Sequence, residues 1–302
     1  MAKLILNSYA KLNLYLAVLN KRRDNYHNIK TLFERISLAD RLILSPREDA
    51  KIKVSCRHPG VPKDSSNLCY QGAELLRKSF NIKKGLQIRL IKRIPVGAGL
   101  GGGSSNAATL LWGLNRFWRL NLSRKKLLVL AAKLGSDVPF FIHNTSFAIG
   151  SGRGEKIKPL GPGRLPKLWH VIVVPDFEVS TPLIYGKWDQ FRRRKTCCKS
   201  CSSGLTIPEF DVKILTSVLS KDTLGLAGGI LFNGLEEAAF RAYPEIKRVK
   251  DSLVSLGINS VLMSGSGPAV FGIVSSRKEA LALRGKIRGI EKSWRVFTAS
   301  TL

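Results

Sequence analysis

The stretch RIPVGAGLGGGSSNAATLLWGL, residues 93–114, joins a strand-like pattern to a helical pattern through a glycine-rich loop. Gly97, Gly99 and Gly102 match the G-x-G-x-x-G spacing of a dinucleotide-binding turn. Glycines let backbone N–H groups approach a phosphate closely, and the first turn of the following helix offers unpaired donors and the positive end of a dipole. The stretch therefore predicts a phosphate-binding loop, and it leaves the kind of phosphate compound open.

Two familiar phosphate-binding motifs do not fit this loop. A dinucleotide site has an acidic residue about 20 residues after its glycines, but the first carboxylate after this loop is Asp137. A Walker loop ends in Gly-Lys-Ser/Thr, whereas this loop ends in Gly103-Ser104-Ser105 and has no lysine. Both kinds of site are therefore disfavoured. The two serines add hydroxyl groups for a phosphate or for a bound magnesium ion.

Composition and charge limit the class of protein. The chain has 302 residues, with 50 Lys plus Arg against 21 Asp plus Glu and a net charge of +29. Such a chain attracts polyanions, so a basic nucleic-acid-binding protein is an alternative function. The basic residues recur along the whole chain, and the densest cluster, 190–204, has no aromatic ladder beyond Phe191. We therefore expect no specific nucleic-acid partner.

The cellular setting follows from the apolar runs and the cysteines. No apolar run approaches the ~20 residues of a membrane span. The first residues lack a signal-peptide pattern, so we expect a cytoplasmic protein without a membrane partner. We expect the protein to be a monomer or a weak homodimer. An odd number of cysteines argues against a disulfide scaffold, and Cys198-x-x-Cys201 has no second pair to complete a zinc site. A reduced surface loop is the preferred interpretation of this segment, over a metal or redox role.

The order of extended and helical patterns predicts an α+β fold rather than a regular β-α-β alternation. Residues 159–167, rich in Pro and Gly, are the best candidate for a domain boundary. Ser123 is the expected N-cap of one helix, and Gly135 its left-handed C-cap. The expected strands cover 3–19 as two short strands or a hairpin, 24–38 after a turn, 40–46, 50–56, 86–94, a hairpin over 145–161, 168–176, 259–265, 269–276 and 294–301. The expected helices cover 64–80, a segment from Ser105, 124–135, 211–220, 245–257 and 278–289.

Three stretches resemble the motifs of the GHMP small-molecule kinases. PVGAGLGGGSSNAA (95–108) is similar to their glycine-serine phosphate loop, YAKLNLYL (9–16) to their polar N-terminal strand, and LMSGSGPAVFGI (262–273) to their C-terminal glycine turn. The resemblance implies a two-domain α+β GHMP kinase fold. Residues 1–160 would form the ATP-binding domain, similar to domain 2 of ribosomal protein S5, and residues 168–302 a ferredoxin-like C-terminal domain.

Two further stretches resemble one branch of this family. RRDNYHNIKTLF (22–33) and LGSDVPFFI (134–142) are similar to segments of the kinases that phosphorylate the 2-hydroxyl of a cytidyl diphosphate ester of methylerythritol, in the non-mevalonate route to isoprenoids. Asn25 stands where the family has Gly, a mild change because Asn tolerates a left-handed turn. Segment 192–203 has no counterpart and is expected to be an inserted loop. Homoserine-type or mevalonate-type kinases are the alternative, disfavoured because their substrates have no pyrimidine for Tyr26 and His27 to bind.

The resemblance implies the catalytic pair. Asp137 would be the catalytic base and Lys11 its partner at the substrate hydroxyl, where the ammonium group would stabilise developing phosphate charge. The structural alternatives are an N-cap aspartate and a strand-edge lysine that reaches water. ATP and Mg²⁺ are the implied cofactors; Mg²⁺ would be carried with ATP, with no protein ligand assigned to it and Ser105 as the candidate residue near it.

The resemblance also implies the binding residues. Asn13, Tyr26 and His27 would bind the cytidyl diphosphate portion of the substrate, with Tyr185 as the second aromatic ring of a pyrimidine sandwich. The turn Gly265, Ser266 and Gly267 would cover the substrate diphosphate with backbone donors, unless it is only a hairpin turn. The ATP-binding residues would be Asn67, Pro95, Val96, Gly97, Ala98, Gly99, Leu100, Gly101, Gly102, Gly103, Ser104 and Ser105.

Overall fold

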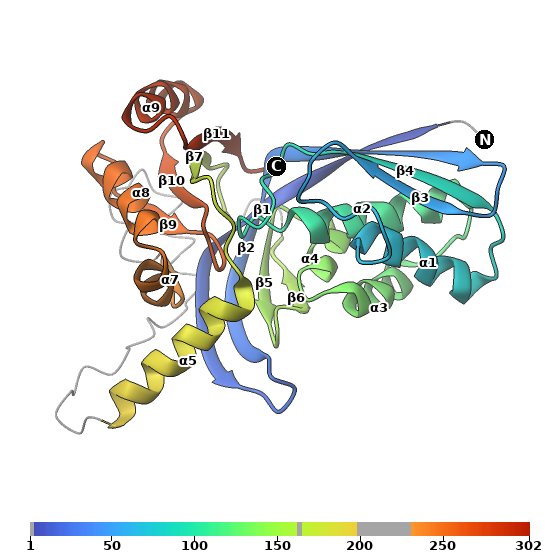
Figure 1. The fold of residues 1–302 in the computed structure, drawn as a ribbon, viewed down its shortest axis with the longest axis horizontal. Coiled ribbons are helices and arrows are strands. Elements are labelled where there is room, and N and C mark those ends of the chain that lie inside the picture. The colour runs from blue at the N-terminus through green and yellow to red at the C-terminus, as the bar shows by residue number, and fades with distance from the viewer. Residues whose placement is uncertain (1–2, 162–164, 198–230) are drawn as a thin grey trace.

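The computed structural model describes residues 3–161, 165–197 and 231–302, which form two β-sheets with helices packed against them (Figure 1). The seven-stranded first sheet has the order β3-β4-β2-β1-β8, and β5 pairs with both β2 and β6. The antiparallel second sheet has the order β11-β7-β10-β9. The strands are β1 (Leu4–Lys21), β2 (His27–Arg47), β3 (Ile52–Cys56), β4 (Gly85–Ile91), β5 (Phe147–Ser151), β6 (Lys156–Pro159), β7 (Trp169–Val174), β8 (Phe232–Asn233), β9 (Val261–Met263), β10 (Val270–Val274) and β11 (Arg295–Ser300).

The helices form two groups on the two sheets. Helices α1, α2 and α4 contact the first sheet and α3 packs on these three helices, while α8 and α9 contact the second sheet (Figure 1). Helix α5 contacts α7 and runs beside the hairpin of β1 and β2. Their bounds are α1 (Leu68–Phe80), α2 (Gly102–Phe117), α3 (Arg124–Leu134), α4 (Val138–His143), α5 (Thr181–Cys197), α7 (Glu236–Ala242), α8 (Pro244–Ser255) and α9 (Arg277–Ile290).

The first two strands are longer than the sequence predicts. Residues 3–19 do not form two short strands, because β1 pairs with β2 from Leu4↔Leu44 to Lys21↔His27 in one ladder. The expected strands 24–38 and 40–46 are likewise one strand, β2. Register shifts at Tyr9/Ala10 and Asn13/Tyr15 explain the difference. Such bulges bend a strand where a sequence pattern suggests that it ends.

Helix ends test the predicted caps. The Ser123 side chain accepts a hydrogen bond from the backbone of Lys126, so this N-cap is confirmed. Gly135 is the C-cap of α3, as predicted, and its N–H donates to Ala131 O, but the predicted left-handed conformation is wrong: its φ of 166° is extended backbone, just before α4. Helix α2 begins at Gly102 rather than Ser105. Asn25 does adopt the expected left-handed conformation, with φ 65°.

Three apolar cores connect these layers. One lies between the first sheet and α1 to α4, and another packs the second sheet against α5 and α7 to α9. The third joins the two sheets and includes Leu12 and Ile36 from the first and Ile172 and Phe271 from the second. The two halves of the chain therefore share buried apolar surface, which stabilises their contact by about 25 cal/mol for each Å² removed from water.

The C-terminal half also adds backbone pairs to the first sheet. Strand β8 lies parallel to β1, with Leu16 opposite Asn233, and Thr301 forms a β-bridge with Ile36. The division into domains 1–160 and 168–302 stays a prediction, and the boundary segment 159–167 is described only in part. The predicted helix 211–220 and the Cys198-x-x-Cys201 segment lie outside the described residues. Segment 192–203 is not simply an inserted loop, because residues 192–197 continue α5.

Within the described ranges, no helix is both long and apolar enough to cross a membrane.

Two glycine substitutions test the packing of α2 on the first sheet. A Cβ at Gly113 would lie 2.5 Å from Leu6 Cδ1 and 2.9 Å from Leu44 Cδ1, whereas a Cβ at Gly285 in α9 meets nothing within 4 Å. We expect Gly113→Ala to lower the free energy of unfolding by about 1 kcal/mol, because overpacking outweighs the gain in helix propensity. Gly285→Ala is the matched control and should raise it by about 0.5–1 kcal/mol. Urea unfolding of both variants checks this, and a stabilised Gly113→Ala would contradict it.

Candidate functional site

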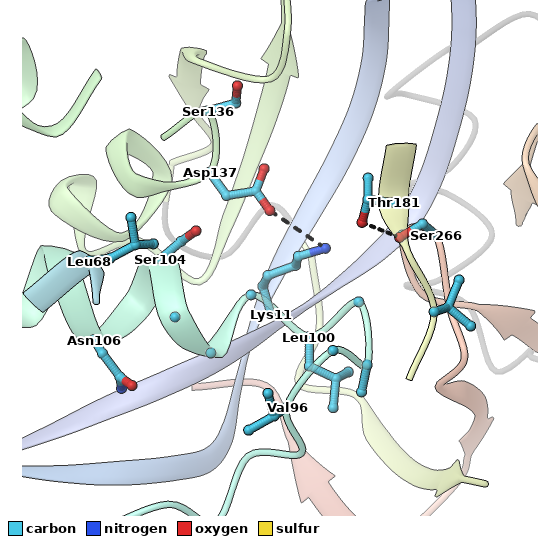
Figure 2. Close-up of a pocket in the computed structure, with 18 of the residues that line it drawn as sticks. Lys11, Leu68, Val96, Leu100, Ser104, Asn106, Ser136, Asp137, Thr181 and Ser266 are labelled. Atoms are coloured by element: carbon cyan, nitrogen blue, oxygen red, sulfur yellow. Dashed lines mark hydrogen bonds and ion pairs between the residues drawn. The ribbon is translucent and has the colours of Figure 1, made fainter. Parts of the chain in front are cut away.

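A cavity of about 780 Å³ brings together the predicted motifs. Its walls come from the glycine loop 95–104, the β1–β2 hairpin, the segment before α4, the start of α5 and the turn residues Gly265 and Ser266 (Figure 2). In the close-up, the Lys11 and Asp137 side chains point toward each other across this space. Residues far apart in the sequence thus surround one cavity.

The glycine loop takes its shape from positive backbone angles. Gly97, Gly99 and Gly101 have φ values of 63°, 73° and 68°, which side chains rarely tolerate. At Gly99 a Cβ would lie 2.1 Å from the backbone oxygen of Ser264, so no side chain fits there. Helix α2 has Gly101 as its N-cap and no side-chain cap, which leaves the N–H groups of its first turn for a ligand.

A buried hydrogen-bond network holds the base of the loop. The Asp40 carboxylate pairs with Lys92, and it accepts hydrogen bonds from the backbone of Arg93 at 2.7 Å and of Ile94 at 2.9 Å. Asn106 in α2 donates to the same carboxylate at 2.9 Å. Since Asp40 is on β2, Lys92 to Ile94 lead from β4 into the loop and Asn106 is on α2, the network fixes the point where the loop starts relative to the helix it enters.

Lys11 and Asp137 form an ion pair in the cavity, with 3.8 Å between Nζ and Oδ2 (Figure 2). The Lys11 side chain is 5% exposed, and its ammonium donates a hydrogen bond to Asn13 Oδ1 at 2.5 Å. Burial lowers the pKa of Lys11 from its ordinary value of 10.5, while the Asp137 charge acts in the opposite direction. Lys11 is thus a buried cation and not a strand-edge lysine that reaches water.

The Asp137 carboxylate is available to a ligand. Asp137 is the N-cap of α4, yet its side chain makes no capping hydrogen bond. Its side chain is 31% exposed, to the cavity that it lines. The alternative role as a capping aspartate is therefore not supported by the geometry.

Aromatic residues gather at the far end of the cavity. His27 stacks on Tyr185, with ring centroids 5.0 Å apart and an interplanar angle of 27°. Burial raises the pKa of Tyr185, and the Asp137 charge adds to the shift, so the phenol keeps its proton. Tyr26 is 53% exposed, and the Arg153 guanidinium lies over its ring, 4.8 Å from the centroid. This end can bind a flat, polar ring.

Nearly all the residues predicted for the site line the cavity; Ser105 and Gly267 do not. The Ser105 hydroxyl is hydrogen-bonded to Ser8 Oγ at 2.7 Å and is buried, so it does not face the space where magnesium was expected. Asn67 lines the cavity, but its side chain caps α1 through Cys69 N at 2.8 Å and donates to Pro62 O at 2.6 Å.

Sequence reasoning missed several residues of the cavity. Thr181 donates to or accepts from Ser266 Oγ at 2.8 Å and thereby links the start of α5 to the glycine turn (Figure 2). Arg153 and Lys92 bring positive charge to the walls. Asp189 lies behind His27 and contacts its Nε2 at 2.7 Å. The available signal was its helical spacing of four residues from Tyr185.

Metal binding by protein side chains alone is not indicated. Over the ranges that the structure describes, no three His, Cys, Asp or Glu side chains lie close enough together to hold a metal ion. The Ser104 hydroxyl and the Asp137 carboxylate are among the oxygen donors that line the cavity near the loop. Such a small set of hard donors suits a Mg²⁺ ion that is held mainly by substrate phosphates.

Family models and a relative match most of the chain. The model of the GHMP kinases N terminal domain matches residues 67–145, and that of the GHMP kinases C terminal domain matches residues 217–289. A protein of Shouchella clausii named 4-diphosphocytidyl-2-C-methyl-D-erythritol kinase is 39% identical over 282 residues, which cover 93% of this chain and 89% of that protein.

Solved structures show the same fold. A crystal structure of 4-(cytidine 5'-diphospho)-2C-methyl-D-erythritol kinase aligns with a TM-score of 0.79 at 34% identity, over 98% of both chains. The mevalonate kinase of Methanococcus jannaschii aligns with a TM-score of 0.72 at 13% identity, over 100% of this chain and 99% of that one. The second likeness shows the fold alone.

Replacing Lys11 tests whether burial of its ammonium group lowers the free energy of unfolding. Because burial lowers the Lys11 pKa, holding the charge destabilises the folded state below pH 10.5. We expect Lys11→Met to raise the free energy of unfolding at pH 7 by about 1 kcal/mol. The gain should shrink as the pH rises toward 10.5, where the unfolded lysine also loses its proton. Urea unfolding at several pH values measures it.

The control for this substitution is Lys247→Met, which removes an exposed lysine paired with Asp251 in α8. It should change stability by no more than about 0.5 kcal/mol. A Lys11→Met protein that is less stable than wild type at pH 7 would show that the ion pair with Asp137 outweighs the cost of burial.

Proposed function

The chain belongs to the GHMP kinases, and we propose that it transfers the terminal phosphoryl group of ATP to the 2-hydroxyl of 4-diphosphocytidyl-2-C-methyl-D-erythritol. Support comes from relatives of that name at about 40% identity over nine-tenths of the chain. The observation that carries the chemistry is the Lys11–Asp137 pair, which lines the same cavity as the glycine loop. Phosphoryl transfer needs positioning and charge stabilisation, and these residues supply both.

The glycine loop would bind the phosphates of ATP. The free N–H groups at the start of α2 and the positive end of its dipole face the cavity, and Ser104 adds a hydroxyl donor. Apolar side chains of Val61, Pro62, Leu68 and Val96 line the adjoining part of the cavity and suit the adenine ring. Asn67 supports this part from its position as the N-cap of α1.

Asp137 and Lys11 would act on the substrate hydroxyl. In this proposal the Asp137 carboxylate accepts the proton of the 2-hydroxyl as its oxygen attacks the phosphorus atom. The Lys11 ammonium would stabilise the charge on the transferred group, because a charge in a site sheltered from water interacts strongly. Asn13 holds the Lys11 ammonium by accepting its hydrogen bond, and itself donates to Thr31 at 2.8 Å.

Mg²⁺ fits this cavity as an ion carried with ATP. It would neutralise phosphate charge, with Ser104 and Asp137 as the protein oxygens within reach and not Ser105 as the sequence suggested. The preference for Ser104 follows from burial, because the Ser105 hydroxyl is turned into the network with Ser8.

The aromatic end would bind cytosine and the turn would bind the diphosphate. Tyr26 and Tyr185 offer ring faces for stacking, and His27 offers a ring nitrogen for hydrogen bonding. Gly265 and Ser266 line the cavity and would offer backbone donors to the diphosphate, with Ser266 held by Thr181. The proposal also includes a cytoplasmic monomer or weak homodimer without a nucleic-acid partner.

A turnover assay with three acceptors tests the proposed function. We expect ATP-dependent phosphorylation of 4-diphosphocytidyl-2-C-methyl-D-erythritol, and at least a thousandfold lower kcat/KM with homoserine or mevalonate. Absence of turnover of the cytidyl compound by folded protein would refute the proposal. Tight binding to DNA or RNA with a steep dependence on salt would favour the alternative, a nucleic-acid-binding protein.

Asp137→Asn tests the assignment of the base. Asparagine keeps the shape but cannot take up the proton, so kcat should fall by about 10²–10⁴-fold. ATP affinity, measured by calorimetry, should change little because the loop and α2 are untouched. The control is Asp251→Asn, which removes an exposed carboxylate on α8 and should keep full activity. An Asp137→Asn protein with more than a tenth of the wild-type kcat would remove Asp137 as the base.

A further inference from the structure

One face of α5 packs against the β1–β2 hairpin next to the aromatic end of the cavity (Figure 1). Tyr185, Trp188 and Asp189 follow a spacing of three and four residues, which places them on the same side of the helix. All three contact His27 of the hairpin. Tyr185 stacks on its ring, Trp188 meets it edge-on with 5.4 Å between the ring centroids, and Asp189 forms a hydrogen bond with it. Arg192, one turn further on, donates to the backbone oxygen of Leu19.

The contact with Asp189 fixes the proton on His27. Asp189 Oδ1 lies 2.7 Å from His27 Nε2, and Lys21 Nζ lies 2.7 Å from the other carboxylate oxygen. Burial raises the pKa of Asp189, but the hydrogen bonds from Lys21 and His27 outweigh it, and the net pKa is below the ordinary value. An ionised carboxylate only accepts hydrogen bonds, so Nε2 must carry the hydrogen atom.

The other ring nitrogen of His27 is left for a ligand. A neutral imidazole with its hydrogen on Nε2 has a lone pair on Nδ1 and is there an acceptor. No residue within the described ranges makes a hydrogen bond to Nδ1, and Nδ1 is not among their buried polar atoms without a partner. The side chain is only 4% exposed, and it lines the cavity. What it offers to a ligand is therefore one acceptor in a sheltered place.

From this geometry we infer that Asp189, anchored by Lys21, is a positioning residue that makes His27 a hydrogen-bond acceptor and so selects a base with an amino group over one with a carbonyl group. The inference rests on the proposed function, in which the base is cytosine. Cytosine presents a 4-amino donor, whereas uracil presents a 4-oxo acceptor that would face the lone pair of Nδ1. A buried acceptor without a donor strongly disfavours the wrong ligand.

The contact between Asp189 and His27 is more buried than an ordinary surface ion pair. The Lys21 side chain is 46% exposed, but Asp189 is 17% and His27 is 4% exposed. A pair that only anchored α5 would need no particular tautomer of His27. Trp188 and Arg192 already anchor this part of the helix, through the apolar core and through Leu19.

Asp189→Asn is the decisive variant. An asparagine amide either accepts from Nε2–H or donates to a bare Nε2, so it no longer imposes one tautomer on His27. We expect KM for the cytidyl substrate to rise at least tenfold, with KM for ATP within twofold of wild type. The preference in kcat/KM for the cytidyl substrate over its uridine analogue should fall at least tenfold. Asp189→Glu retains a carboxylate and should restore part of that preference.

A second measurement reports the proton directly. Nitrogen-15 NMR of the imidazole rings distinguishes the two tautomers, and with four histidines in the chain the His27 signals can be assigned by a His27→Gln variant. Wild type should show the hydrogen on Nε2, and Asp189→Asn should show a mixture or the Nδ1–H form. Asp251→Asn, an acid that pairs with a lysine on α8, is the matched control and should change neither the spectrum nor the preference.

The outcomes distinguish this inference from the proposed function. If wild type does not phosphorylate the cytidyl compound, the proposed function fails, while the NMR experiment still decides where the proton lies. The inference itself is overturned if wild-type His27 carries its hydrogen on Nδ1. It is also overturned if folded Asp189→Asn keeps both the wild-type KM and the wild-type preference for cytosine over uracil.

Discussion

The site depends on the close docking of the glycine-loop backbone between two other segments. The Leu100 oxygen accepts a hydrogen bond from the Lys11 backbone at 3.0 Å, and the Ala98 oxygen accepts one from Ala269 at 3.3 Å. The Gly99 oxygen accepts a third from the Ser264 hydroxyl at 3.1 Å. The loop backbone lies so close to the turn that no side chain fits at Gly99. The loop, β1 and the turn 264–267 therefore keep one fixed arrangement. The ammonium of Lys11 is carried on the same strand, so its position follows from that docking.

Around this contact the molecule places charges where burial is costly. Lys11 is buried at the cavity, where Asn13, Asp137 and the ring of Phe33 contact its ammonium, while Lys92 and Asp40 pair behind the loop. Neither arrangement is needed to bury apolar surface, since the three apolar cores already connect the layers. The buried charges instead fix the direction of a few polar groups, and a protein tolerates such a cost where chemistry depends on direction.

Much of this site was predictable because its signals are local. Glycines that need positive φ, the Ser123 cap and the left-handed Asn25 all act within a few residues of themselves, so the sequence pattern predicts them well. The family motifs likewise predicted that Lys11 and Asp137 would meet.

The predictions that were wrong or missing concern residues whose conformation or contacts depend on the surrounding structure. Gly135 was assigned a left-handed cap from its position alone, whereas the chain beyond it continues into another helix and needs extended backbone there. Ser105 looked equivalent to Ser104, but the direction of a helix side chain depends on which neighbour, here Ser8, packs against it. Asp189 was missed because its contact with His27 exists only after α5 has packed on the hairpin.

The parallel pairing of β8 with β1 bears on how the protein is made. A ribosome releases β1 and β2 long before residues 232–233, so the edge of β1 and the apolar residues that will face the second sheet stay open during most of synthesis. Unpaired strand edges next to apolar surface are sites of aggregation. The two-residue strand β8 therefore covers part of the β1 edge only late in synthesis, and the Thr301 bridge to Ile36 of β2 is among the last backbone pairs of the first sheet to form.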